Sequence, residues 1–332
     1  MPNIADGDYI PLNEGDLVLA DASEDYVEIA KPLVLFKTDG RNIVSGLHTI
    51  ALHPHDVESL FLYNVFNSQN FRRYGYKVGT GLKVFGVSSK NILKYSFNSP
   101  SMYEQKKIDS ILLKLTDLIA ANEDKLEQLK TLKKLMMQKI FSQEWRFKGF
   151  TDPWEQRKLG ELFNERKEKS SQGELLSVTI NSGIVKFDTL DRKNNSSADK
   201  SNYRVVRYGD IAYNSMRMWQ GASGLSMYNG IVSPAYTVIT PRTNTDAGFM
   251  AVNFKRKSMI QVFQRNSQGL TSDTWNLKFP VLKNIRISIP KITEQQIITE
   301  LFTVINNLIA ANEDKLNQLK KLKKYLMQNM FV

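Results

Sequence analysis

The chain lacks several kinds of chemistry. It has no cysteine among its 332 residues, which excludes disulfides, thiolate metal sites and a cysteine nucleophile. The only histidines are His48, His53 and His55, and because no cluster of further ligands accompanies them, we expect no metal site. No apolar run is long enough to span a membrane, and the N-terminus has neither the basic region nor the apolar core of a signal peptide. We therefore expect a cytoplasmic protein without a membrane anchor.

Catalytic motifs are also missing. There is no Gly-x-Ser-x-Gly elbow and no cluster of carboxylates typical of a nuclease. Residues 79–83 (GTGLK) hint at a phosphate loop but lack the spacing of a Walker motif or a dinucleotide fingerprint. We interpret them as a turn in which Lys83 is a candidate backbone-phosphate contact. We assign no catalytic residue and no cofactor, and expect that the chain alone does not catalyse a reaction.

Positive charge is present and unevenly distributed. Lys and Arg number 45 against 34 Asp and Glu, a formal net charge of +11. Residues 142–290 carry 22 basic and 13 acidic side chains, whereas residues 1–103 carry 9 and 11. A concentrated basic excess favours a polyanionic partner such as nucleic acid. The alternative, that the charge serves only solubility, stays open on charge alone.

One segment occurs twice. The sequence LIAANEDKL at residues 118–126 returns unchanged at residues 308–316. Around both copies, apolar residues alternate at spacings of three and four over several heptads, which predicts two long helices of coiled-coil type. We expect them to pair antiparallel within one chain, although each could also serve as a homodimerisation arm. The seam and partner-interface positions are Leu112, Leu115, Ile119, Asn122, Leu126, Leu129, Phe302, Ile305, Ile309, Asn312, Leu316 and Leu319.

Each predicted seam contains one asparagine, Asn122 or Asn312. A buried polar residue lowers stability but selects register and partner. If the helices are antiparallel about a pseudo-twofold axis, we expect the two asparagines to come close together at its centre.

The repeats divide the chain into a mixed α/β (α+β) protein with two globular modules separated by the helix pair. Strand patterns at residues 211–213, 231–232 and 236–239 alternate with turns, residues 246–248 predict a turn, and residues 249–264 predict a helix. We expect the following segments: a partial first module at 1–100, a helix at 101–141, a linker at 142–153, a complete second module at 154–289, and a helix at 290–332.

The two modules resemble each other over part of their length. Residues 14–18 (EGDLV) parallel 208–212 (YGDIA), and residues 85–100 parallel 275–290. Nothing before residue 14 corresponds to residues 154–207. We therefore expect the first module to lack the N-terminal half that the second module has.

Residues 214–223 (NSMRMWQGAS) suit the reading of duplex DNA. Arginine suits bidentate contact with guanine, and asparagine or glutamine with adenine, in the major groove. A basic stretch upstream supplies candidate phosphate contacts, and two hydroxyls after Leu270 add further ones. Met218 and Trp219 have an alternative reading as core residues. The candidate DNA-binding residues are Arg192, Lys193, Asn194, Lys200, Tyr203, Arg204, Asn214, Ser215, Arg217, Trp219, Gln220, Thr271 and Ser272, with Lys83 in the first module.

At these residues the sequence resembles a known family. Residues 146–160 (RFKGFTDPWEQRKLG), residues 213–222 (YNSMRMWQGA) and the paired LIAANEDKL helices resemble the specificity subunits of type I restriction–modification systems. The resemblance implies a non-catalytic, DNA-binding subunit that reads a split double-stranded target, one half per recognition domain, with the helix pair as a ruler.

The same resemblance implies the partners. Two modification (methyltransferase) subunits using S-adenosylmethionine would dock on the helices. Restriction subunits, which use ATP and magnesium, would complete the endonuclease complex, and a second specificity chain is a further candidate partner. Two alternatives stay open: a truncated or silent gene copy without independent activity, and a coiled-coil scaffold that does not bind DNA.

Overall fold

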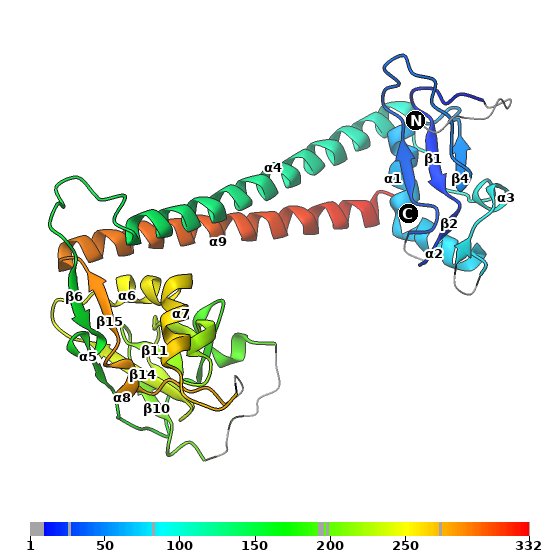
Figure 1. Cartoon of the computed structure of the whole chain (residues 1–332). Helices are drawn as coiled ribbons and strands as arrows, with labels where there is room; N and C mark the ends of the chain where they lie inside the picture. The colour runs from blue at the N-terminus through cyan, green and yellow to red at the C-terminus, as the bar shows by residue number, and fades with distance from the viewer. Residues whose placement is uncertain are drawn as a thin grey trace. The chain divides into compact units, whose positions relative to one another are not determined.

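The computed structural model describes residues 10–25, 28–81, 84–191, 196, 199–271 and 274–331. The chain folds as two compact units: unit 1 comprises residues 1–127 with 311–332, and unit 2 comprises residues 128–310. The two predicted long helices are α4 (Met102–Phe141) and α9 (Ile292–Asn329), and each contributes residues to both units (Figure 1). The expected mixed fold, with long helices between strand-containing modules, is confirmed.

Both long helices begin with the same side-chain to backbone hydrogen bond. The side-chain amide of Gln105 donates to the carbonyl of Pro100 at 2.8 Å, and that of Gln295 donates to Pro290 at 2.8 Å. Both glutamines are only 1% exposed. The bond ties each helix to the extended residue before it, which explains why the repeat includes a proline and, five residues later, a glutamine.

Unit 1 is built on a three-stranded antiparallel sheet in the order β3-β1-β4. Its strands are β1 (Leu17–Ala20), β3 (Pro32–Val34) and β4 (Thr49–Leu52). The other elements are β2 (Ala22–Ser23), paired with β5 (Phe85–Gly86), and helices α1 (Ser59–Asn67), α2 (Gln69–Val78) and α3 (Ser89–Ile92). Apolar side chains of β1, α1 and α2 form its core with residues of both long helices.

Within unit 1 the two long helices run antiparallel. Lys323 donates to Thr116 at 2.8 Å, and Lys320 forms an ion pair with Glu123 at 2.6 Å. This register places residues near 318 level with Asn122, about six residues or roughly 9 Å from Asn312 along the axis. The expected meeting of the two asparagines at one level is therefore not observed. The amide of Asn122 instead donates to the carbonyl of Leu118 in its own helix, at 2.6 Å.

Unit 2 has a four-stranded antiparallel sheet in the order β12-β11-β14-β7. Its strands are β7 (Phe163–Glu165), β11 (Ile211–Asn214), β12 (Ser223–Leu225) and β14 (Tyr236–Pro241). Three two-stranded pairs complete the strands: β6 (Glu155–Lys158) with β15 (Arg286–Ile289), β8 (Leu176–Thr179) with β9 (Gly183–Lys186), and β10 (Arg204–Val206) with β13 (Gly230–Val232).

The predicted helix at 249–264 is two helices, α6 (Ala247–Phe254) and α7 (Lys257–Asn266). The predicted turn at 246–248 is instead the start of α6, because the Asp246 carboxylate accepts a hydrogen bond from the Phe249 amide at 2.7 Å and caps the helix. Short helices complete the unit: α5 (Leu159–Leu162), α8 (Phe279–Leu282), and the 3-10 turns η1 (Phe187–Thr189) and η2 (Met218–Gln220).

The core of unit 2 also includes residues of both long helices. Ile140 and Phe141 of α4 belong to the same buried cluster as Ile298 and Phe302 of α9. The Phe141 ring stacks on Phe249 at 5.3 Å between centroids. All twelve predicted seam positions are buried or half-buried, which agrees with the periodicity from which they were predicted.

Candidate nucleic-acid interface

The polar segment predicted to read DNA follows β11 directly and is shaped by bonds to its own backbone. The Asn214 side chain accepts from the Met216 amide at 3.0 Å, and the Trp219 indole donates to the Met216 carbonyl at 3.0 Å. Gly221 closes the turn in the left-handed region, at φ 83°. Residues 214–221 therefore form a compact loop at the carboxyl end of a buried strand.

Within this loop the side chains divide into anchors and exposed groups. Met218 is fully buried, and Ser215, 7% exposed, shares a hydrogen bond with Thr237 at 2.8 Å. Arg217 is exposed, and among the described residues no side-chain hydrogen bond or ion pair engages its guanidinium. The buried carbonyl oxygen of the Gln220 side chain has no described partner. Arg217 is thus the exposed polar side chain of this loop without a described side-chain partner, whereas the unpartnered oxygen of Gln220 is buried.

Two other segments converge on this loop. Helix α7 packs against η2, and the backbone amide of Leu277 donates to the Ser215 carbonyl at 2.8 Å. The Trp219 ring meets Trp275 edge to face, with centroids 5.2 Å apart. The structure therefore brings Trp275, four residues after the candidate Thr271, next to the predicted reading loop. Trp275 was not predicted as a site residue, although it begins the segment 275–290 that parallels residues 85–100.

Lys255, also missed by the sequence analysis, holds the end of the loop. Its ammonium donates to the carbonyls of Gly221 and Ile180, both at 2.7 Å. Burial, with a smaller contribution from the charge of Lys133, lowers the pKa of Lys255 to about 8. Its position after α6, within a segment expected to be continuous helix, gave no signal of this role.

The second predicted cluster lies on and before β10. Tyr203 is 4% exposed, and Arg204 is half-buried and ion-paired with Glu165 at 3.0 Å. Lys200 is half-buried. Tyr203 and Arg204 therefore have structural contacts in this unit, and their DNA contacts stay predictions. Five further candidates lie outside the described residues: Lys83, Arg192, Lys193, Asn194 and Ser272.

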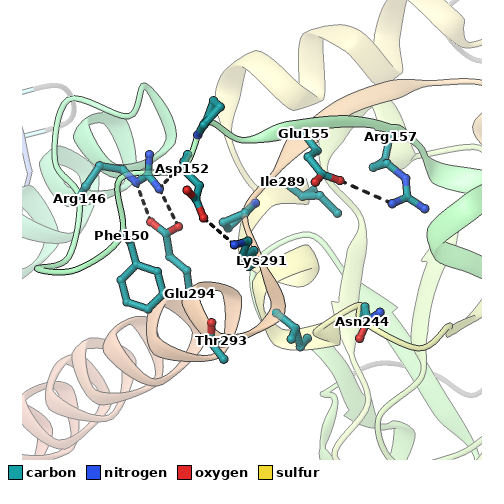
Figure 2. A pocket seen from close by; sticks show the side chains of 13 residues that line it. Arg146, Phe150, Asp152, Glu155, Arg157, Asn244, Ile289, Lys291, Thr293 and Glu294 are labelled. Carbon is teal, nitrogen blue, oxygen red and sulfur yellow. Dashed lines mark hydrogen bonds and ion pairs between the residues drawn. The ribbon is translucent and has the colours of Figure 1, made fainter.

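A cavity of about 640 Å³ lies where the linker meets the start of α9 (Figure 2). The guanidinium of Arg146 grips Glu294 with two bonds of 2.7 and 2.9 Å, and Lys291 pairs with Asp152 at 2.6 Å. The charged groups at this joint are paired with one another, so we assign the cavity a structural role.

The described residues contain no group of three or more potential metal-ligating side chains. No helix among them is both long and apolar enough to cross a membrane.

Comparisons with known proteins identify the family of this chain. The family described as "Type I restriction modification DNA specificity domain" matches residues 151–321. The specificity subunit of the type I restriction enzyme MjaVIII from Methanocaldococcus jannaschii is 25% identical over an alignment of 276 residues that covers 75% of this chain. The chain spans 64% of the length of that relative.

Solved structures share the fold. The S subunit of a type I restriction–modification system from M. genitalium aligns over 98% of this chain and 84% of its own, with a TM-score of 0.63 and 13% identity. The HsdS subunit from Thermoanaerobacter tengcongensis aligns over 96% of this chain and 80% of its own, with a TM-score of 0.50 and 14% identity.

Proposed function

The chain belongs to the family of type I restriction–modification DNA specificity domains, and from this premise we propose that it selects the DNA sequence on which a restriction–modification complex acts. Unit 2 is the principal reader in this proposal. The observation that carries it is the loop at residues 214–221, where the exposed Arg217 has no described side-chain partner, on a module of high positive charge.

The proposed reading follows from how the loop is built. A base contact contributes specificity only if the side chain reaches the groove from a fixed backbone. Here the Asn214 and Trp219 side chains bond to the backbone of Met216, and Lys255 fixes Gly221. The loop backbone is therefore held while Arg217 stays exposed. Phosphate contacts by other basic side chains of unit 2 would supply affinity without sequence preference.

The remaining parts have proposed roles as well. The outer faces of α4 and α9 would dock two modification subunits, and restriction subunits would join that complex. Exposed apolar side chains such as Leu118 and Leu308, at equivalent positions of the two repeats, are 49% and 47% exposed and support a docking role. Catalysis would reside in these partners.

Mapping methylated bases genome-wide, in cells with the modification subunit and with or without this chain, tests the proposal. We expect methylation at a defined site only when the chain is present, and a changed or lost site with Arg217→Ala. Identical methylation patterns with and without the chain would contradict the proposal and favour a silent copy. Binding to random DNA that does not weaken as salt rises would favour the scaffold alternative, because phosphate contacts release counterions.

A further inference from the structure

The tip of the β8–β9 hairpin, residues 180–182, lies beside the end of the loop at residues 214–221. The ammonium of Lys255 donates to the carbonyl of Ile180 in the tip and to the carbonyl of Gly221 in the loop, both at 2.7 Å. A second contact lies just beyond each segment. Gly224 approaches Gly183 so closely that a Cβ on Gly224 would come within 2.7 Å of the Gly183 Cα. The tip and the loop are therefore held side by side at two points.

The backbone of the tip is fixed by its own hydrogen bonds. The Thr179 hydroxyl accepts from the Ser182 amide at 3.0 Å and donates to the Gly183 carbonyl at 3.2 Å. Gly183 has φ 66°, in the left-handed region that a tight turn requires here. A side chain reads a base with specificity only from such a fixed backbone. The tip meets this requirement as the loop does.

Two side chains of the tip are suited to reading an A·T pair. Asn181 is exposed, and among the described residues no hydrogen bond or ion pair engages its side chain. Ile180 is 41% exposed. In the major groove asparagine suits bidentate contact with adenine, and an apolar side chain suits the methyl group of thymine. The tip therefore complements Arg217 of the loop, whose guanidinium suits guanine.

The free-energy cost of burying Lys255 indicates what this side chain does. Burial lowers the pKa of Lys255 to about 8, and no ion pair engages its ammonium among the described residues. A buried ammonium without a carboxylate partner lowers the stability of a fold. The two carbonyls that Lys255 binds belong to separate segments, so its bonds fix the position of one segment relative to the other.

We propose that the hairpin tip is a second DNA-reading element, in which Asn181 contacts a base near the one that Arg217 reads, and that Lys255 is the positioning residue that holds the tip against the loop. This inference rests on the proposed function and extends it to a second element of the same site. Base pairs follow one another at about 3.4 Å, so two segments in contact address positions within a few base pairs of each other.

Selection from a random duplex library, by the full chain with its modification subunit, tests the role of the tip. Asn181→Ala should lower the preference at one A·T position about tenfold, and this position should differ from the one that Arg217→Ala relaxes. Asn284→Ala is the matched control, because Asn284 is an exposed asparagine of the same unit whose amide already donates to the Pro280 carbonyl at 3.0 Å. It should leave every position unchanged.

A double-mutant cycle tests the role of Lys255. Lys255→Met keeps much of the side-chain length but removes the ammonium, and discrimination between selected and random duplexes should fall about tenfold. The affinity for random duplexes should change by less than about threefold, and the unfolding midpoint of unit 2 should not fall. Adding Asn181→Ala to Lys255→Met should lower discrimination by less than about twofold more, because the tip has already lost its position.

The outcomes separate this inference from the proposed function. Enrichment of no sequence by the natural chain would overturn both. A site that is enriched by the natural chain and unchanged at every position by Asn181→Ala would overturn the inference alone, whether or not Lys255→Met folds. Additive effects of Lys255→Met and Asn181→Ala would overturn the positioning role. So would a loss of discrimination in Lys255→Met that only matches its loss of folded protein.

Discussion

The two modules share one framework and differ in what surrounds it. β1 of unit 1 and β11 of unit 2 each pair with two neighbouring strands in the same register. Each follows a turn with a glycine of positive φ, Gly15 or Gly209, and a buried aspartate, Asp16 or Asp210. However, three residues of β14 are buried and none of β4 is. The helix starts differ in the same way. Glu294 is 2% exposed and gripped by Arg146, whereas its counterpart Glu104 is exposed. The comparison teaches that the repeated sequence specifies strand register, and that burial depends on segments outside the repeat.

The largest difference in stability between the two units is expected when their equivalent buried aspartates, Asp210 and Asp16, are substituted. Asp210→Ala removes the two shorter bonds of Arg166, whose side chain is only 16% exposed, and leaves its charge with the half-exposed Glu168 carboxylate at 3.4 Å. We expect a loss of about 3–5 kcal/mol in the unfolding free energy of unit 2. Asp16→Ala should lower the unfolding free energy of unit 1 by about 1–2 kcal/mol. The loss is smaller because the partner of Asp16, the His53 imidazole, is 56% exposed and can bond to water instead.

Fluorescence separates the two units in this measurement. All four tryptophans lie between residues 145 and 275, so their denaturant-induced change reports on unit 2, and circular dichroism reports on the whole chain. Equal losses of unfolding free energy for Asp210→Ala and Asp16→Ala would show that the two units do not differ in how strongly they depend on this aspartate.

A second contrast lies within α9. Leu316 is 8% exposed and Leu322 is 47% exposed. Leu316→Asp buries a charge in the seam and should lower the stability of unit 1 by about 3 kcal/mol or more, while Leu322→Asp should change it by less than about 1 kcal/mol. Thermal melts followed by helix signal test this, and co-purification with the modification subunit shows whether docking follows. If Leu322→Asp abolishes docking and Leu316→Asp does not, the exposed face of α9 is the surface that contacts the modification subunit.

Much of this architecture was predictable, for identifiable reasons. The long helices follow from a period that side-chain packing imposes on sequence, and the parallel between residues 14–18 and 208–212 located the shared turn and aspartate. The roles of Arg166, Lys255 and Trp275 were not predictable. Arg166 meets Asp210 across 44 residues, and Lys255 meets Gly221 across 34, so only the folded chain reveals these pairs.

A third contrast concerns the reading loop. Arg217→Ala or Gln220→Ala should cost about 1–3 kcal/mol of discrimination for each lost bidentate base contact, with little change in fold stability. Arg157→Ala is the control, since Arg157 is engaged by Glu161 at 2.7 Å on the surface of the same unit. Competition binding between selected and random duplexes measures the effect. Loss of discrimination in both arginine variants, with none in Gln220→Ala, would mean that charge and not base reading had been removed.

The smallest effect is expected at another position that differs between the repeats. Asp109 in α4 corresponds to Thr299 in α9. Burial raises the pKa of Asp109 to about 6, although Asn64 donates to it at 3.1 Å and partly offsets the shift. The folded state therefore binds this proton more tightly than the unfolded chain, so stability is lost as pH rises from about 4 through about 6.

Asp109→Asn removes the free-energy cost of ionising this buried carboxyl group. The variant should exceed the natural protein in stability by about 1–2 kcal/mol at pH 8 and match it near pH 4. Unfolding at both pH values by circular dichroism measures the gap. An advantage of the same size at both would show that the carboxyl does not titrate in this range.

Selection from a random duplex library, by the full chain together with its modification subunit, tests the central claim most directly. The account predicts enrichment of a defined sequence, with the preference at one or more positions relaxed by Arg217→Ala and preserved by Arg157→Ala. Enrichment of no sequence, or of one that Arg217→Ala and Gln220→Ala both leave unchanged, would contradict the assignment of sequence reading to the loop at residues 214–221.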